Sequence, residues 1–251
     1  MQCTSFNLQS VFLISDFQDQ SFQIGLLKAN VLRHIQDSQF IDVTHAIKLN
    51  NTIEAAFIGK TILAELPDNT VFIVAVGQNK TWTAYPFKGG LILTPNNGLL
   101  SMLLQDIDYK QVAVFDQSNL DSILKQWLKQ ASIQTQHPID TLDIRYNKQP
   151  QFNDQICTAE CCFIDGNGNC YFNLNADAFN HFTQQRAFSI KIQHYNGQVF
   201  SKIHKHVNDV VSGDALFRFD HLGHLMFQVN QGSAKQLFRI KDDTKIIIEI
   251  L

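Results

Sequence analysis

Short apolar runs alternate with helix-like segments through the first half of the chain. The runs, each short enough for a strand buried on both faces, lie at residues 11–15, 40–44, 70–76, 91–93 and 111–115. The segments with helical spacing of apolar positions lie at residues 21–36, 51–65, 97–104 and 118–131. Strands that alternate with helices indicate βαβ units, so this half is expected to form an α/β domain with a largely parallel sheet.

The period of apolar positions changes to two beyond about residue 138. Residues 132–150 are rich in Gln, Asp and Pro, which is typical of a linker. Residues 188–205 and 216–229 each predict a hairpin around a Gly-containing turn, and residues 245–251 predict a terminal strand. Such a pattern favours a small antiparallel β-barrel, because closure removes exposed strand edges. The predicted organisation is an α/β domain at 1–138, a linker at 139–150 and a β-barrel domain at 151–251.

Composition excludes several classes of protein. The chain has 251 residues, of which 45% are hydrophobic and 17% charged, as in ordinary folded proteins. Its Lys and Arg residues form no dense patch, so nucleic acid is not an expected partner. No apolar stretch reaches the roughly 18 residues that a membrane helix needs, and the first residues do not resemble a signal peptide. These features predict a cytoplasmic protein that has no membrane partner.

Cysteines and acidic residues between 157 and 170 suggest metal sites that their spacing does not support. Cys161 and Cys162 are adjacent on a predicted strand, so they point to opposite faces, and no second Cys or His pair stands at zinc spacing. Residues 165–169 begin like a calcium loop, but Cys170 and Ala176 occupy the positions that require Gly and Glu. Buried thiols are therefore expected, with neither a metal nor another cofactor.

Ligands of open parallel sheets bind beyond the carboxyl ends of the strands, which directs attention to the residues after each run. Asp16 follows the first run, in an acidic turn that lacks a glycine-rich phosphate cradle. A carboxylate at that place suits the two hydroxyls of a ribose. Alternatively, Asp16 or Ser21 only caps the helix that follows. The position alone leaves both interpretations open.

Five segments match family motifs in order along the chain. They are residues 15–17 with Gly25 and Lys28 (TDFG…VGxMKG), 41–47 (DITHxI), 95–100 (P(D/N)NGLL), 164–169 with Asn173 (IDxFGNxxTN) and 229–234 (VNxGSA). Together they resemble the S-adenosylmethionine (SAM) hydroxide adenosyltransferases, within the SAM-dependent chlorinase/fluorinase superfamily. The resemblance covers nearly the whole chain. It implies an N-terminal α/β domain, a C-terminal β-barrel, and a homotrimer whose ligand lies between neighbouring subunits.

The resemblance also implies roles for individual residues. Asp16 would accept hydrogen bonds from the ribose hydroxyls, Asp165 would face the amino group of the methionine portion, and Asn169 would meet the adenine edge. The main chain at Gln231 and Gly232 would also meet the adenine. Alternatively, Asn169 only shapes a turn, and Gly232 only supplies a positive φ. The residues implied to bind SAM or adenosine are Asp16, Asn97, Asp165, Asn169, Asn230, Gln231 and Gly232.

The family hydrolases convert SAM and water to adenosine and methionine with an Asp–Arg–His set. This sequence has Gly77, Ala84 and Asp116 at the matching positions. Three hypotheses follow. The chain hydrolyses SAM with substitute residues such as Asp116, or it binds SAM or adenosine without chemistry, or it is a degenerate trimer with a structural or interaction role. In each case SAM is a substrate or ligand, not a cofactor.

Overall fold

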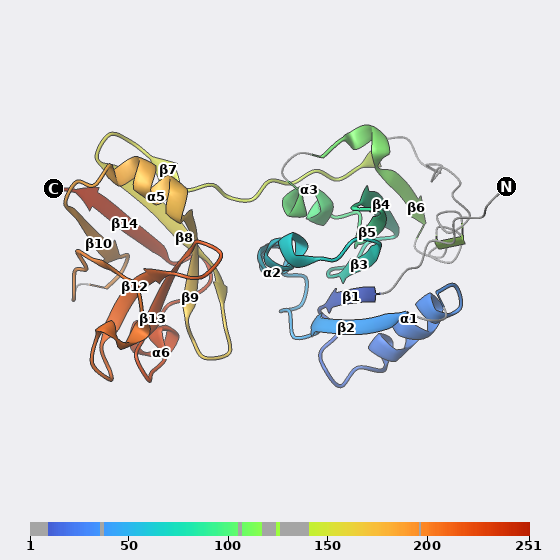
Figure 1. The fold of residues 1–251 in the computed structure, drawn as a ribbon, viewed down its shortest axis with the longest axis horizontal. Helices are drawn as coiled ribbons and strands as arrows, with labels where there is room; N and C mark the ends of the chain where they lie inside the picture. Colours follow the sequence, from blue (N-terminus) through green and yellow to red (C-terminus); the bar gives the residue numbers. More distant parts are fainter. Residues whose placement is uncertain (1–9, 36–37, 105–106, 117–123, 126–140, 196) are drawn as a thin grey trace. The chain divides into compact units, whose positions relative to one another are not determined.

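The computed structural model describes residues 10–35, 38–104, 107–116, 124–125, 141–195 and 197–251. The chain divides into two compact units, Met1–Asn147 and Lys148–Leu251 (Figure 1). The helix predicted at 118–131 lies almost entirely outside the described residues. Residues 141–145 hydrogen-bond to the rest of the N-terminal unit: for example, Asn96 Nδ2 donates to the Thr141 carbonyl at 2.9 Å.

A six-stranded sheet forms the centre of the N-terminal unit. Its strands are β1 (Ser10–Ser15), β2 (Gln39–Thr44), β3 (Thr70–Ala75), β4 (Thr81–Phe87), β5 (Gly90–Pro95) and β6 (Ala113–Asp116), and their order is β2-β1-β3-β5-β4-β6. The helices are α1 (Phe22–Leu32), α2 (Thr52–Glu65), α3 (Leu99–Leu103) and a 3₁₀ turn at Tyr109–Gln111.

The prediction of a largely parallel sheet was wrong at β4, which the apolar pattern missed. This strand runs antiparallel to both of its neighbours, β5 and β6, so the sheet is mixed. Lys88 and Gly89 connect β4 to β5, and both have positive φ, 46° and 72°. A two-residue turn of that kind matches the right-handed twist of an antiparallel pair. Burial in β4 is continuous from Trp82 to Ala84, which hides the period-two alternation of a typical hairpin strand.

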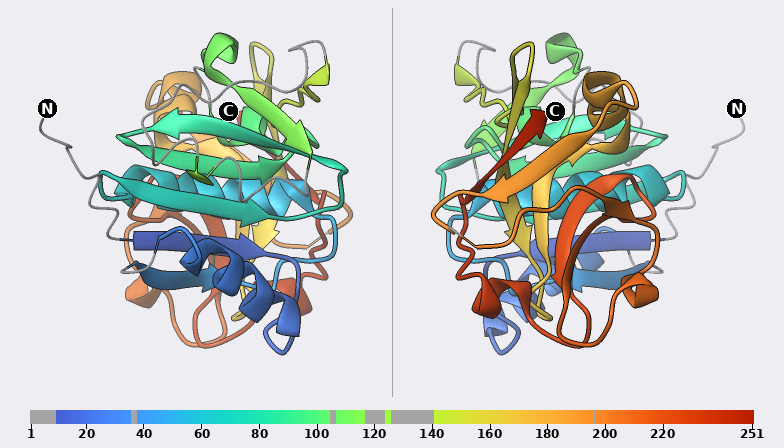
Figure 2. Two further views of the ribbon diagram at one scale, coloured as in Figure 1. Left: turned by 90° about the vertical axis from the view of Figure 1, so that its right-hand side faces the viewer. Right: turned by 90° about the vertical axis from the view of Figure 1, so that its left-hand side faces the viewer.

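Helices cover both faces of this sheet (Figure 2). Val31 of α1 packs into the core on one face, while Ala55 and Ala56 of α2 and the leucines of α3 pack on the other. The Ser21 hydroxyl caps α1 by accepting from Gln23 N at 3.2 Å, and Asn51 caps α2 by accepting from Glu54 N at 3.2 Å. The residue that caps α1 is therefore Ser21, which leaves the Asp16 side chain for another role.

The C-terminal unit is built on a strongly curved sheet. Its strands are β7 (Gln151–Phe152), β8 (Ile156–Ile164), β9 (Cys170–Asn175), β10 (Phe188–Ile192), β11 (Ile203–His204), β12 (Ala215–Phe219), β13 (His224–Val229) and β14 (Lys245–Ile250). The order is β10-β14-β8-β9-β13-β12-β11, with β7 paired to β8. The helices are α5 (Ala176–Thr183) and α6 (Ala234–Leu237), with a 3₁₀ turn at Val207–Asp209. Phenylalanines dominate the core: Phe217 and Phe227, for example, lie 4.5 Å apart between ring centroids.

Two predictions for this unit need correction. The sheet curls into a half-barrel but does not close, because its edge strands β10 and β11 are not paired with each other. It is also not purely antiparallel, since β11 runs parallel to β12. The hairpin predicted at 188–205 was wrong. β10 pairs along its whole length with the terminal strand β14, and its only pairing with the segment that follows it in sequence is the isolated bridge between Ile190 and Phe200. The β12–β13 hairpin is confirmed.

No helix among the described residues is long and apolar enough to cross a membrane.

Candidate functional site

The carboxylate of Asp16 is held at the end of β1 by two distant segments of the chain. Its Oδ2 accepts the backbone N–H of Asn50 at 2.9 Å and that of Gly77 at 3.0 Å. The side chain is buried, with 8% of the residue exposed, yet its Oδ1 has no hydrogen-bond partner among the described residues. One oxygen of the carboxylate is therefore used to fix its position, and the other remains available as an acceptor.

The turn that carries Asp16 is fastened to the end of β2. His45 Nδ1 lies 2.7 Å from the Ser15 hydroxyl, and the His45 carbonyl accepts the backbone N–H of Gln18 at 2.9 Å. On the other side of the ring, His45 Nε2 lies 3.2 Å from Asp42 Oδ1. Burial acts to raise the pKa of Asp42, but the hydrogen bonds from Lys28 and His45 outweigh it and lower the pKa. Ser15 is completely buried, so this chain of contacts positions the turn and does not present a nucleophile.

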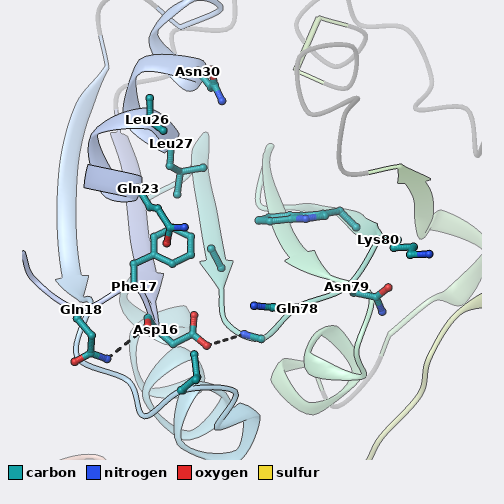
Figure 3. A pocket seen from close by; sticks show the side chains of 14 residues that line it. Asp16, Phe17, Gln18, Gln23, Leu26, Leu27, Asn30, Gln78, Asn79 and Lys80 are labelled. Atoms are coloured by element: carbon teal, nitrogen blue, oxygen red, sulfur yellow. Dashed lines mark hydrogen bonds between the residues drawn. The ribbon is translucent and has the colours of Figure 1, made fainter. Parts of the chain in front are cut away.

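A cavity of about 880 Å³ opens beside Asp16 within the N-terminal unit. The residues that line it are Asp16, Phe17, Gln18, Gln23, Leu26, Leu27, Asn30, Leu49, Ala75, Gly77, Gln78, Asn79, Lys80 and Trp82. Figure 3 shows Asp16 with one carboxylate oxygen bonded toward the main chain and the other directed toward Phe17 and Gln23. Among the described lining residues, Asp16 is the only carboxylate and Lys80 the only cation.

Asn97 supports the cavity from outside its lining. Its Nδ2 donates to the Val76 carbonyl at 2.9 Å, and its Oδ1 accepts the backbone N–H of Leu99 at 3.3 Å. A Cβ atom at Gly77 would lie 2.7 Å from Asn97 Nδ2, and Gly77 has a φ of +78°. The chain therefore approaches Asp16 closely at Gly77 because this residue has no side chain.

In the C-terminal unit, Asp165 and Asn169 form a closed turn between β8 and β9. Asp165 Oδ1 accepts the backbone N–H groups of Asn167 and Asn169, both at 2.9 Å, and Oδ2 accepts the Asn169 Nδ2 at 2.8 Å. The two predicted ligand residues are thus bonded to each other. Burial raises the pKa of the neighbouring Tyr171 to about 12, and the negative charge of Asp165 adds to this effect.

The turn that follows β13 lies against the turn at Asp165. Lys235 N donates to the Gly168 carbonyl at 2.9 Å, and a Cβ at Gly168 would lie 2.0 Å from the Ser233 hydroxyl. The preceding residues of this turn are Asn230, which is buried and donates from Nδ2 to the Val210 carbonyl at 2.8 Å, and Gln231, which has a φ of +56°. Gly232 is exposed, and its φ is not positive. The structure therefore brings two motifs that are about 60 residues apart in sequence to one end of the half-barrel.

The family is decided by matches over both units. The N-terminal domain of the SAM hydroxide adenosyltransferases matches residues 11–141, and their C-terminal domain matches residues 159–247. The chain belongs to the SAM hydroxide adenosyltransferase family. It therefore lies within the SAM-dependent chlorinase/fluorinase superfamily, and its domains indicate a SAM-binding or SAM-processing protein.

Two solved structures have a similar fold. An uncharacterized conserved protein from Thermotoga maritima is 22% identical with a TM-score of 0.72, and the match covers 96% of this chain and 99% of that one. A conserved hypothetical protein from Thermus thermophilus is 17% identical with a TM-score of 0.70, and the match covers 97% and 100%. At these identities the likeness shows the fold alone.

The three positions matched to the catalytic set of SAM hydroxide adenosyltransferases lie in different surroundings. Gly77 lines the cavity, Ala84 is completely buried in β4, and Asp116 is exposed at the end of β6, opposite Thr81. Asp116 is not among the residues that line the cavity. The structure thus does not bring the predicted catalytic residue Asp116 to the cavity beside Asp16.

The described residues contain no group of three or more His, Cys, Asp or Glu side chains that could hold a metal ion. The cysteines of β8 and β9 are free thiols, and burial raises the pKa of Cys157 to about 12 and that of Cys162 further. Such thiols are poor nucleophiles and poor metal ligands at neutral pH.

Sequence analysis missed several residues that line the cavity, most clearly Trp82 and Leu27. Trp82 belongs to the unrecognised strand β4, and Leu27 lies on the predicted helix but was assigned only to its apolar face. A signal for Trp82 was available, because aromatic side chains commonly line ligand pockets and Trp82 lies close in sequence to Gly77, which follows the third apolar run.

Proposed function

We propose that this chain binds the adenosine portion of SAM, with Asp16 accepting hydrogen bonds from the ribose hydroxyls. The observation that supports this is that the two oxygens of the Asp16 carboxylate have different contacts. Oδ2 is occupied by Asn50 N and Gly77 N, while Oδ1 faces the cavity without a partner among the described residues. An ionised carboxylate oxygen fixed in this way is a strong acceptor for a sugar hydroxyl.

The C-terminal unit would supply the rest of the site. Asp165, Asn169, Asn230, Gln231 and Gly232 lie on two adjoining turns, and Asn169 keeps its Oδ1 as an acceptor for the amino group of adenine. We further propose a homotrimer in which these turns close the Asp16 cavity of a neighbouring subunit. Analytical ultracentrifugation tests this part, since a monomer at micromolar concentration would contradict it.

Hydrolysis of SAM is the reaction to test, because both matched domains belong to a family named for transfer of the adenosyl group from SAM to hydroxide. In that reaction the oxygen of water bonds to C5′ of the ribose, the C5′–sulfur bond breaks, methionine leaves as a neutral thioether, and a proton is released. Sulfonium is already a good leaving group, so the protein must mainly position and deprotonate the water. Among the described residues that line the cavity, Asp16 is the only carboxylate, so no second carboxylate there could deprotonate the water. We therefore propose that binding predominates and turnover is slow.

The decisive experiment compares two variants in the same turn. Asp16→Asn can keep the two contacts to Asn50 N and Gly77 N through its oxygen, but it turns the free acceptor into a donor. Asp19→Asn removes the same charge at an exposed neighbour that does not line the cavity. Calorimetry with SAM and adenosine should show binding about 10- to 100-fold weaker for Asp16→Asn. Asp19→Asn should bind like the unmodified chain.

Chromatography of the same mixtures separates binding from catalysis. Appearance of adenosine and methionine in proportion to time and to protein concentration would establish the chain as a hydrolase, and a rate of many turnovers per chain each minute would contradict slow turnover. Absence of binding to both ligands, or equal binding by the two variants, would contradict the proposed role of Asp16.

A further inference from the structure

Apolar side chains from several segments form part of the cavity wall beside Asp16, and the proposed adenosine contacts do not use them. We define this wall by five lining residues, Phe17, Leu26, Leu27, Ala75 and Trp82. We propose that it is a subsite for a neutral, apolar group, preferably an aromatic one carrying a hydrogen-bond acceptor, bound next to the ribose. This inference rests on the proposed function only for the placement of the ribose.

Four separate segments build the wall, one of them the turn between β1 and α1 that carries Phe17, which makes it a fixed feature of the fold. Leu26 and Leu27 come from α1, Ala75 ends β3, and Trp82 lies on β4 between β5 and β6. Trp82 is 7% exposed and belongs to the same core as Ala75 and Phe115, so its ring is held in place. Leu26 is 57% exposed, an apolar side chain at the cavity that the core does not cover.

Trp82 also offers an unused polar group. Its indole N–H makes no hydrogen bond among the described residues, and it is not one of the buried side-chain nitrogens that lack a partner, so it is open to the cavity. An indole N–H that faces a cavity is a directed donor, which water or an acceptor atom of a ligand can satisfy. A ligand that brings an acceptor to the wall would satisfy the indole and gain both contact area and a hydrogen bond.

The charge of the surroundings selects a neutral occupant. Lys80, the one cation among the described lining residues, lies away from Asp16 in Figure 3. The flanking polar groups are the amides of Gln23, Asn30 and Gln78, which carry no charge. In the proposed complex the Asp16 carboxylate is bonded to the ribose and Lys80 lies away from it, so a charged group against the wall would have no opposite charge of its own, whereas a thioether or aromatic group needs none.

Two sources could supply this chemistry. The group is either the 5′ substituent of the nucleoside itself, as in an alkylthio or arylthio adenosine, or a separate molecule bound beside the ribose. Reactions that transfer the 3-amino-3-carboxypropyl chain of SAM to an acceptor break the bond between that chain and sulfur and release a neutral thioether nucleoside, so the first source belongs to the class of products of SAM chemistry.

The test uses the fluorescence of Trp82. The sequence contains two tryptophans, so a Trp127→Phe chain reports on Trp82 alone. In one arm this chain is titrated with adenosine, 5′-methylthioadenosine and 5′-phenylthioadenosine. In the other arm it is titrated with thioanisole, with and without saturating adenosine. Each arm is repeated with Leu26→Ala and with the matched control Leu32→Ala, an exposed leucine of the same helix that does not line the cavity.

We expect 5′-phenylthioadenosine to bind about tenfold or more tighter than adenosine and to change the Trp82 emission. Leu26→Ala should reduce this gain by about threefold, and Leu32→Ala should leave it unchanged. A response to thioanisole only in the presence of adenosine would instead support a separate molecule as the source.

If adenosine binds but no apolar compound tightens binding or changes the emission, the subsite proposal is overturned while the proposed function stands. Equal effects of Leu26→Ala and Leu32→Ala overturn the subsite proposal as well. If thioanisole changes the emission of Trp82 but adenosine never binds, the subsite stands and the proposed function falls.

Discussion

Asp16 and Asp165 are both proposed to meet the same ligand, but the chain holds them in opposite ways. Asp16 is fixed by main-chain N–H groups that are 34 and 61 residues away in sequence, and only one of its oxygens is used. Asp165 is fixed by residues two and four positions away, and both of its oxygens are used. The first carboxylate depends on the tertiary structure, whereas the second is a local turn.

This difference separates the functional roles of the two carboxylates. A turn that satisfies itself can form early and at low cost, but it leaves little acceptor capacity for a ligand. A carboxylate held by distant segments needs the whole N-terminal unit to be folded, and in return it presents a free oxygen in a fixed direction. Ligand recognition by charge should therefore depend more on Asp16 than on Asp165.

The largest expected effect comes from changing the donor that holds Asp16. Gly77→Ala forces a side chain into a left-handed backbone and against Asn97 Nδ2, so we expect a loss of about 2–3 kcal/mol in the free energy of unfolding. Gly213→Ala is the matched control, because Gly213 has a φ of +90° but open space around its Cβ, and it should cost about 1 kcal/mol. Urea unfolding of both variants measures the difference. Equal losses would show that the contact with Asn97 is unimportant.

Removal of the Asp16 carboxylate tests the contribution of the carboxylate that is held by distant segments of the chain. Asp16→Ala leaves Asn50 N and Gly77 N without their acceptor, so we expect a loss of about 1–2 kcal/mol as well as weaker adenosine binding. Hydrogen exchange should be faster at the amide of Gly77. An unchanged exchange rate there would mean that the two N–H groups do not depend on Asp16.

Asp165→Ala tests the carboxylate that is held by its own turn. We expect it to lower the free energy of unfolding by about 1 kcal/mol or less. The freed N–H groups belong to Asn167, which is exposed, and to Asn169, which is half-buried, so water can replace much of what the carboxylate provides. Asp165→Asn should recover much of the loss, because its oxygen can accept from the same main-chain groups. A loss larger than that of Asp16→Ala, measured in the same urea experiment, would reverse the comparison.

The smallest effect is expected at Asp220, a second carboxylate held locally in a turn. Burial acts to raise its pKa, but the hydrogen bonds from His224 Nδ1 at 3.1 Å and from the backbone N–H groups of His224 and Leu222 lower it below the ordinary value of 3.8. A carboxyl whose pKa is lowered by folding stabilises the protein above about pH 4 and loses this contribution as the pH falls through the folded pKa.

Asp220→Asn should therefore cost about 0.5 kcal/mol at about pH 7 and almost nothing at about pH 2 to 3. Urea unfolding at the two pH values measures this. A penalty that grows toward acid pH would contradict the direction of the pKa shift.

Much of the N-terminal fold follows from the amino-acid pattern. The continuous apolar run at residues 70–76 predicted a buried strand, and Asn51 followed by Glu54 predicted the start of α2; the structure confirms both. β4 was missed because burial on both faces removes its alternation. The open half-barrel was missed because β10 pairs with β14, and these segments are over 50 residues apart in sequence. A local turn motif cannot predict a pairing between segments so far apart.

The features of the candidate site also separate into those that local sequence predicts and those that depend on distant segments. The sequence by itself determined the family and the carboxylate at the end of the first strand, and it offered a turn as the alternative interpretation of Asn169, because motifs and turns depend on residues that are close in the chain. Only the tertiary structure decided that Gly77 and Asn50 hold Asp16, that Asp116 lies outside the cavity lining, and that Trp82 forms part of its wall. The physical reason is that a free oxygen, a cavity and an unpaired N–H are defined by what distant segments leave unfilled.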